Sequence, residues 1–395
     1  MYDIAIVGGG PAGLSAAYSA AKEGSSVIVL ERDKSIGHNI RTSGVSWIRE
    51  MEKLSIPSKY YNPIKNYRFI SPNNEVQIND NDSKSCVLDI RGLYQYLAHL
   101  ATNNGAEISL NSTVTNASIS VHENLCKLSV NTIRGQKNIE CRLIIDASGF
   151  NSIVARKLGF AKNWNRYGIG AEYECYCDFV DSKTWTLMVG RQYSSAGYAW
   201  VFPLSNNRIR LGVGVGRPES EEDPINKLNF LIRNKLKPLN ELGRIQPIEF
   251  HIGYIPNQGA RSSVSDNLLL VGDSAGQSNP LVLEGIRHAI EFGRLAGLIG
   301  SESLNYNCTK KSLIRYEQEW KNKINSKINS ALRVQKRWLN LTDKQWDTEI
   351  DILKSMNIDQ FLDFVMADFD KKKIMRLAFN NPKIIAKQLF SLVLK

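Results

Sequence analysis

The stretch that decides the fold is residues 2–13, YDIAIVGGGPAG. Residues 2–7 are apolar and partly β-branched, which predicts a buried strand. The glycine turn after them leads into an alanine-rich helix over residues 14–22, which Gly24 ends. Residues 26–30, SVIVL, predict a second strand with Glu31 at its end. This strand–turn–helix–strand unit is typical of a domain that binds a dinucleotide.

Gly8, Gly10 and Gly13 have the spacing of a dinucleotide-binding turn. Gly8 permits the tight turn, Gly10 lets a pyrophosphate approach the backbone, and Gly13 lets the helix pack close to the strand. The free amides and the dipole at the helix N-terminus favour a phosphate there. Glu31 is placed to accept hydrogen bonds from ribose hydroxyls, and its charge argues against a 2′-phosphate.

Outward from this unit, the strand-and-helix signal returns twice. A short apolar strand over 141–145 runs into Asp146-Ala147-Ser148-Gly149, and LLLV over 268–271 runs into Gly272-Asp273 and a helix over 284–297. Between them, residues 163–258 alternate as an antiparallel sheet does. We therefore predict an α/β fold with a discontinuous Rossmann-type domain and an inserted antiparallel-sheet substrate domain. The expected boundaries are 1–160 with 260–305 for the first domain, 161–259 with part of 40–100 for the second, and 306–395 for a basic helical region.

The net charge of +11 is concentrated near the C-terminus, where residues 309–395 hold 18 Lys or Arg against 10 Asp or Glu. A basic, Trp-bearing region suits nucleic acid, an anionic membrane surface or an acidic carrier, and it equally suits a solvated helical bundle. The region has neither a zinc-ligand pattern nor an RNP-like signature, so the sequence gives little support for nucleic-acid binding. Apolar residues recur at helical spacing after Pro382, which predicts a helix that lies on anionic lipid or docks on the core.

The sequence shows neither a secretory signal nor a membrane-spanning run, so we expect a cytoplasmic protein, peripheral at the membrane if its basic tail binds lipid. The six cysteines are scattered, and the Cys175-x-Cys177 pair has no second pair to complete a metal site. We interpret them as reduced thiols and expect no metal. The oligomeric state is not predicted.

Residues 268–297, LLLVGDSAGQSNPLVLEGIRHAIEFGRLAG, resemble the second FAD motif of the hydroxylase-type flavoproteins, the class of p-hydroxybenzoate hydroxylase. The resemblance implies FAD, with Asp273 at the ribitol and Gly285-Ile286 beside the flavin ring. The run Leu88-Asp89-Ile90-Arg91 is similar to the segment whose arginine lies near FAD in that class. The FAD-binding residues expected from the motifs and the resemblance are Gly8, Gly10, Ala12, Gly13, Glu31, Arg32, Arg41, Ser43, Gly44, Arg91, Val114, Asp146, Gly149, Gly272, Asp273, Pro280, Gly285 and Ile286.

The element YAWVFP over 198–203, followed by Gly212-Val213-Gly214, resembles the geranylgeranyl reductase family, which includes the archaeal digeranylgeranylglycerophospholipid reductases. In a strand, Tyr198, Trp200 and Phe202 share one face, where they form either an apolar wall suited to a polyprenyl chain or a plain sheet core. With Pro203, they are the expected substrate-lining residues.

One segment departs from that family, whose members carry a Cys-Gly pair after the ribose-binding Glu. Here the segment is Ile40-Arg41-Thr42-Ser43-Gly44-Val45, so either Ser43 or Thr42 stands at the position of the thiol. A hydroxyl is a much weaker acid than a thiol. Ser43 and Thr42 are therefore candidate catalytic residues whose role in proton transfer is open, and His38 lies in the same segment.

The resemblance implies hydride transfer from reduced FAD to C=C bonds of a prenyl lipid. Electrons would come from NAD(P)H bound transiently or from a ferredoxin. One alternative is a flavin-dependent monooxygenase or halogenase acting on an aromatic or carrier-bound substrate, since halogenases carry a related W-x-W-x-[IV]-P pattern. Another is a flavin-bearing redox sensor or electron-transfer protein, which would lack a cavity beside the flavin.

Overall fold

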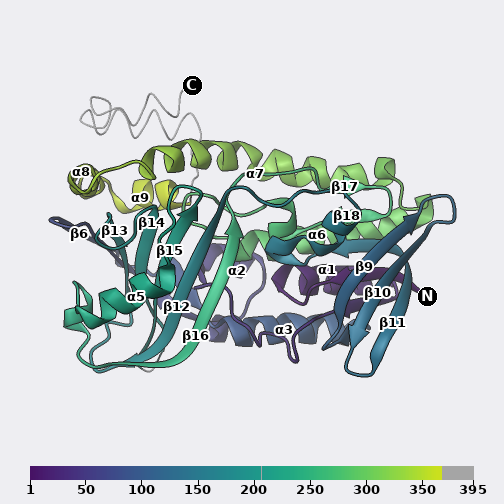
Figure 1. Cartoon of the computed structure of the whole chain (residues 1–395), viewed down its shortest axis with the longest axis horizontal. Coiled ribbons are helices and arrows are strands. Elements are labelled where there is room, and N and C mark those ends of the chain that lie inside the picture. Colours follow the sequence, from purple (N-terminus) through teal and green to yellow (C-terminus); the bar gives the residue numbers. More distant parts are fainter. Residues whose placement is uncertain (206, 367–395) are drawn as a thin grey trace.

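The computed structural model describes residues 1–205 and 207–366 (Figure 1). Its first sheet is built around β1 (Tyr2–Val7), which pairs in parallel with β2 (Val27–Leu30) and with the end of β11 (Gly135–Asp146). The other strands of this sheet are β8 (Glu107–Ser109), β9 (Thr113–Ser120), β10 (Leu125–Thr132), β17 (Val264–Ser265) and β18 (Leu268–Leu270). The expected Rossmann-type sheet made from separate segments of the chain is confirmed.

Helices cover one face of this sheet, and the hairpin β9–β10 with α4 (Ile153–Lys157) packs against the other. The covering helices include α1 (Pro11–Lys22) and α6 (Ile286–Ser303), with α3 (Ile90–Asn103) beside α1. α6 crosses α1 closely because it carries glycine at the contact: a Cβ at Gly297 would lie 2.2 Å from the carbonyl oxygen of Ala16.

The second sheet has seven strands. Their spatial order is β16 (Ile245–Pro256), β12 (Tyr167–Cys177), β15 (Arg208–Arg217), β14 (Gly197–Pro203), β13 (Thr184–Val189), β5 (Asn66–Ile70) and β6 (Glu75–Asn79). All neighbours pair antiparallel except β13 and β5. The sheet therefore combines the expected β-rich stretch with strands from residues 66–79.

Helix α5 (Pro224–Arg233) interrupts the β-rich stretch, where the alternation predicted strands alone. Asp223 caps the helix by accepting hydrogen bonds from the amides of Ile225 and Asn226, and a proline occupies the first turn. These start signals override the surrounding strand pattern. α5 then buries Leu228 and Leu231 against one face of the seven-stranded sheet.

A small sheet joins the two large ones. It consists of β4 (Tyr61–Ile64), β7 (Ser85–Leu88) and β3 (Val45–Trp47), which α2 (Ile48–Lys53) follows. β7 ends directly before α3, so this sheet fixes the position of Arg91 in the first turn of that helix.

α7 (Lys310–Trp338) runs along both large sheets (Figure 1). Its first half buries Tyr316 and Trp320 in the core of the first sheet, and its second half buries Ala331 and Val334 with α8 (Asp343–Lys354) and α9 (Ile358–Val365) on the second. Within residues 1–366, no helix is long and apolar enough to cross a membrane. The helix expected after Pro382 lies outside the described residues.

Candidate cofactor and substrate site

The three spaced glycines of the turn after β1 differ in how much room their backbone has. Gly8 has a φ of +111°, and a Cβ there would lie 2.4 Å from the carbonyl oxygen of Ala147. A Cβ at Gly13 would lie 2.0 Å from the carbonyl oxygen of Gly8. Gly10 has nothing within 4 Å of its Cβ position. Gly8 and Gly13 therefore make the turn itself, and Gly10 leaves open space where a pyrophosphate would approach the N-terminus of α1.

Glu31 follows β2 and lies beside this turn. Its carboxylate accepts hydrogen bonds from the amides of Gly9, at 2.6 Å, and Asp33, at 2.8 Å. The side chain is half-buried, so lone pairs remain for another donor. Arg41 pairs with Asp33 at 3.2 Å, and Arg32 is exposed nearby. This arrangement brings four of the predicted FAD-binding positions, Gly10, Glu31, Arg32 and Arg41, to the end of β2.

Asp146, at the end of β11, is fully buried and already hydrogen-bonded. Its carboxylate accepts from the hydroxyl and amide of Ser148 and from the amide of Ala155. Burial raises its pKa, and these hydrogen bonds act in the opposite direction. Asp146 thus holds the loop of Gly149 against the start of α4, and Ala147 of the same loop contacts the glycine turn.

Asp273, after β18, is in the opposite situation. Within residues 1–205 and 207–366 its carboxylate has no hydrogen-bond or ion-pair partner. Burial raises its pKa to about 7. Its Oδ1 lies 3.5 Å from a Cβ position at Gly285, the residue that starts α6. A half-buried carboxylate without a donor, beside a helix N-terminus, fits the polyhydroxyl chain of FAD, and the open space at Gly10 fits its pyrophosphate.

Three other predicted FAD-binding residues lie in α1, in β9 and in the loop before α6. Ala12 belongs to α1 and contacts the Cβ position of Gly272, whose φ is +68°. Val114 is buried in β9, in the core under the first sheet. Pro280 is buried in the loop before α6, and its carbonyl accepts a hydrogen bond from Gln335 of α7.

Thr42, Ser43 and Gly44 lie together with Glu284, Gly285 and Ile286 on the wall of one cavity, here called the motif cavity. It encloses about 530 Å³, part of it open to solvent. Glu284 was not among the predicted site residues, although it stands inside the quoted motif. It is 9% exposed and pairs with Arg287 at 2.8 Å. His38 does not line this cavity in the part of the chain that the structure describes.

Tyr198, Trp200 and Phe202 do share one face of β14. The rings of Tyr198 and Trp200 are 5.8 Å apart, and those of Trp200 and Phe202 are stacked at 6.0 Å. Tyr198 donates a hydrogen bond of 2.7 Å to the carbonyl of Val282. Pro203 is buried at the end of the same strand.

Of the four predicted substrate-lining residues, Tyr198 lines a second, larger cavity, here called the apolar cavity, which encloses about 1130 Å³, part of it open to solvent. Phe202 lines the motif cavity, whereas Trp200 and Pro203 line neither cavity in the part of the chain that the structure describes. Apart from Gln335, Asn257 and Glu349, the walls of the apolar cavity are apolar, aromatic or glycine, from the seven-stranded sheet and α7, α8 and α9. Five residues line both cavities: Leu187, Tyr198, Val282, Leu283 and Val365. The two cavities therefore adjoin, with the Tyr198–Val282 hydrogen bond at their shared wall.

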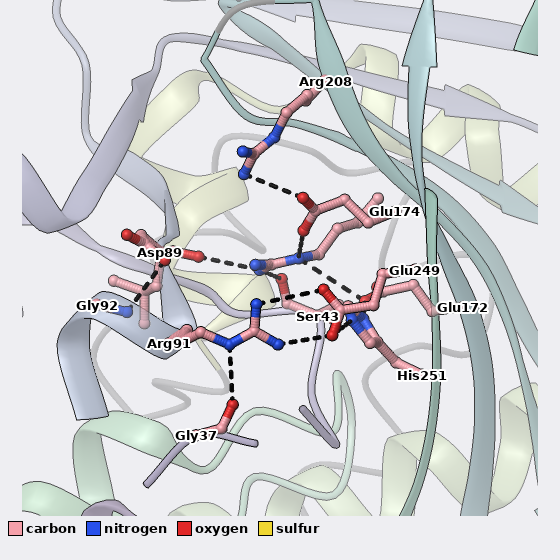
Figure 2. A network of polar contacts seen from close by, with 12 residues as sticks. Gly37, Ser43, Asp89, Arg91, Gly92, Glu172, Glu174, Arg208, Glu249 and His251 are labelled. Carbon is pink, nitrogen blue, oxygen red and sulfur yellow. Dashed lines mark hydrogen bonds and ion pairs between the residues drawn. The ribbon is translucent and has the colours of Figure 1, made fainter. Parts of the chain in front are cut away.

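The same sheet face carries a buried charged network that the sequence analysis missed (Figure 2). The register aligns Phe202, Arg210, Glu174 and Glu249 in one row across β14, β15, β12 and β16. The neighbouring row is Trp200, Gly212, Glu172 and His251. The available signal was the alternation of charged residues, Glu172 with Glu174 and Glu249 with His251, in strands that otherwise predict burial.

In a comparison with known families, residues 3–175 match the model described as FAD dependent oxidoreductase. Residues 167–255 match the geranylgeranyl reductase catalytic domain. The two matches overlap over residues 167–175, which belong to β12.

Two curated relatives are similar over nearly their whole length. Digeranylgeranylglycerophospholipid reductase 2 of Methanothermobacter thermautotrophicus is 29% identical over 361 residues, which cover 89% of this chain and 90% of the relative. Digeranylgeranylglycerophospholipid reductase of Methanocaldococcus jannaschii is 28% identical over 392 residues, covering 98% and 97%.

Solved structures show the same fold. A geranylgeranyl bacteriochlorophyll reductase-like protein from Thermoplasma acidophilum has a TM-score of 0.85 at 22% identity, with 98% of each chain covered. A flavin-dependent brominase also covers 98% of each chain, with a lower TM-score of 0.71 at 17% identity. The halogenases thus share the fold at greater distance.

Proposed function

We propose that this chain, an FAD-dependent oxidoreductase of the geranylgeranyl reductase-like type, reduces carbon–carbon double bonds in a prenyl chain of the geranylgeranyl class. The observation that carries the proposal is the pair of adjoining cavities. One is bordered by Gly285 and Ile286, where the flavin ring is expected, and the other is apolar and is lined by Tyr198 of β14. A long hydrocarbon tail needs such an enclosed apolar space next to the reacting group.

The turn at Gly10 and the carboxylates of Glu31 and Asp273 would hold FAD, and the chemistry that the cofactor, once reduced by a donor, would supply is a hydride for one alkene carbon, with a proton going to the other. The chain's own residues orient the alkene and exclude water. Leu187 and Leu283 line both cavities, so they would hold a tail that extends from one into the other.

The polar groups on the motif cavity are the candidates for handling the proton. Gly44 has a φ of +81°, and a Cβ there would lie 2.6 Å from Cδ1 of Ile90, so this position requires glycine. That requirement favours the alignment in which Ser43 stands at the position of the family's thiol. The Ser43 hydroxyl, with Thr42 and the Glu284–Arg287 pair nearby, would hold a water or relay its proton.

Three finer points belong to the same proposal. Electrons come from NAD(P)H or from a ferredoxin, whose acidic surface would complement this basic chain. The substrate is a lipid, as the names of the relatives indicate for those proteins. Access to such a lipid would be from the cytoplasmic face of a membrane, to which the net charge of +11 attracts the protein.

The test is an anaerobic half-reaction on purified, FAD-loaded protein. The flavin is reduced with dithionite, excess reductant is removed, and a geranylgeranylated glycerophospholipid or geranylgeranyl diphosphate is added. The flavin absorbance should return to the oxidised form, and mass spectrometry should find a product heavier by two hydrogens for each bond reduced.

A flavin that stays reduced until oxygen is admitted would overturn the proposal. It would move the assignment to the monooxygenase or halogenase class, whose flavin reacts with oxygen. The electron-transfer alternative is disfavoured because the flavin motif does border a cavity.

A further inference from the structure

Residues Gly37–Gly44, here called the 37–44 segment, are held through their backbone carbonyls by two arginines from different parts of the fold. Arg91 of α3 donates from Nε to the carbonyl of Gly37, at 3.1 Å, and from Nη2 to that of His38, at 3.5 Å. Arg210 of β15 donates from Nη1 to the carbonyl of Ser43, at 2.9 Å. This segment carries Thr42 and Ser43 onto the motif cavity.

Each arginine is in turn held by carboxylates of the charged network. Arg91 pairs with Glu249 at 2.6 Å (Figure 2). Burial alone would raise the pKa of Glu249, but the hydrogen bond and charge of Arg91 outweigh it and lower that pKa. Arg210, 1% exposed, lies 3.5 Å from Glu174 and 3.8 Å from Glu172. A buried guanidinium is stable only with such partners, because desolvation of an unpaired charge costs several kcal/mol.

A glycine of the sheet lets the 37–44 segment approach β16 closely. A Cβ at Gly253 of β16 would lie 2.1 Å from the carbonyl oxygen of Arg41, so the segment lies directly on the strand. Glu172 accepts hydrogen bonds from Trp200, at 2.8 Å, and from His251 Nδ1, at 3.0 Å if that nitrogen carries the proton. The network thus connects the aromatic wall with the arginine that holds Ser43.

We propose that Arg210 and Arg91 are positioning residues that fix the 37–44 segment, and with it the hydroxyls of Thr42 and Ser43, against the motif cavity. A planar guanidinium that forms ion pairs with carboxylates sets the position of the carbonyl it donates to more strictly than a lysine does. A role of these hydroxyls in acting on a substrate rests on the proposed function. The position of the 37–44 segment does not depend on that function.

Arg41 provides a direct readout of this seating, because it is exposed and lies inside the segment. FAD-loaded protein is treated with trypsin without any lipid, and mass spectrometry follows cleavage between Arg41 and Thr42. In Arg210→Met we expect this cleavage to be about tenfold faster or more than in the wild type, because it requires local release of the segment.

Arg208→Met is the matched control. Arg208 comes from the same strand and pairs with the same Glu174, at 3.0 Å, but none of its contacts reaches the segment in the part of the chain that the structure describes. It should leave the rate of cleavage at Arg41 unchanged. Arg210→Lys should fall between wild type and Arg210→Met.

If Arg210→Met does not fold, Arg91→Met replaces it in the test. The Arg91 side chain is 42% exposed, so its removal leaves no cavity in the core. Equal cleavage rates in the wild type, in Arg208→Met and in a folded Arg210→Met or Arg91→Met would overturn the proposal. Wild-type protein that is cleaved at Arg41 as fast as a folded Arg210→Met or Arg91→Met variant would also overturn the proposal. A failed reductase assay with the expected cleavage pattern would overturn only the proposed function.

Discussion

The indole nitrogen of Trp200 donates a hydrogen bond of 2.8 Å to the carboxylate of Glu172, across the glycine that lies between them in the sheet. That glycine is Gly212, and a Cβ there would lie 2.2 Å from the indole ring. The Trp200 ring therefore lies flat over β15. One contact joins the aromatic face of β14 to the buried charges that hold the 37–44 segment.

Gly212→Ala should displace the Trp200 ring and lower the free energy of unfolding by about 1–3 kcal/mol, as overpacking of a core does. Gly214→Ala is the control, because its Cβ would meet the same ring at an ordinary contact distance of 3.4 Å. Thermal unfolding and near-ultraviolet circular dichroism measure both effects. Equal losses of stability in the two variants would contradict the geometry at Gly212.

Gly10→Ala should lose FAD and keep the fold. The added methyl group meets no protein atom, so stability without FAD should change by less than about 0.5 kcal/mol, but the methyl group occupies the approach of the pyrophosphate. Gly13→Ala should instead lose the fold, because its Cβ meets the carbonyl of Gly8. The ratio of flavin to protein absorbance and a thermal melt separate the two outcomes. A Gly10→Ala protein that retains full FAD content would show that the cofactor does not pass here.

Asp273→Asn should weaken FAD binding roughly tenfold, the value of a hydrogen bond to a charged group. Burial raises the pKa of Asp273 to about 7, so its carboxyl is largely protonated at pH 6 and largely ionised at pH 8. The ionised form is the stronger acceptor for a ribitol hydroxyl. FAD affinity of the wild type should therefore rise from pH 6 to pH 8, and that of Asp273→Asn should not. Titrations of flavin fluorescence at the two pH values test this, and a parallel rise in the variant would exclude Asp273 as the cause.

Leu187→Trp should obstruct the passage between the two cavities, since Leu187 lines both. We expect kcat/KM for a geranylgeranyl substrate to fall about tenfold or more, with FAD content unchanged. Tyr176→Trp, at a position 47% exposed on β12, is the control for added bulk. Unchanged turnover in a folded Leu187→Trp protein would place the substrate elsewhere.

Much of the cofactor-binding domain was predictable because its signals are local. The turn at Gly8 and Gly13 depends on contacts within a few residues, or with the loop at Ala147 that another short motif marks. The helices α1, α3 and α6 begin at recognisable capping residues, Gly10, Asp89 and Gly285. α5 was not predicted, although Asp223 and Pro224 are typical of a helix N-terminus. The strand alternation on both sides of this ten-residue helix is the stronger pattern.

The charged network was not predictable, because its members are brought together by strand register. Glu172, Arg210 and His251 come from three strands up to 79 residues apart, and each alone is an ordinary polar residue in a sheet. A shift of one residue in register would turn Arg210 to the opposite face and leave Ser43 without its donor.

The sequence by itself determined the dinucleotide turn and the aromatic face of β14, because each follows from residue type and spacing along one segment. The second flavin motif and the absence of the family's thiol were identified from the resemblance to known families. Only the tertiary structure decided that Asp146 accepts several hydrogen bonds while Asp273 has no donor among residues 1–205 and 207–366, and that α7 covers both sheets. It also decided that Thr42 and Ser43 lie on a cavity shared with Glu284. The physical reason is that burial, hydrogen-bond satisfaction and cavity walls are properties of residues that meet across long stretches of chain, which no local pattern records.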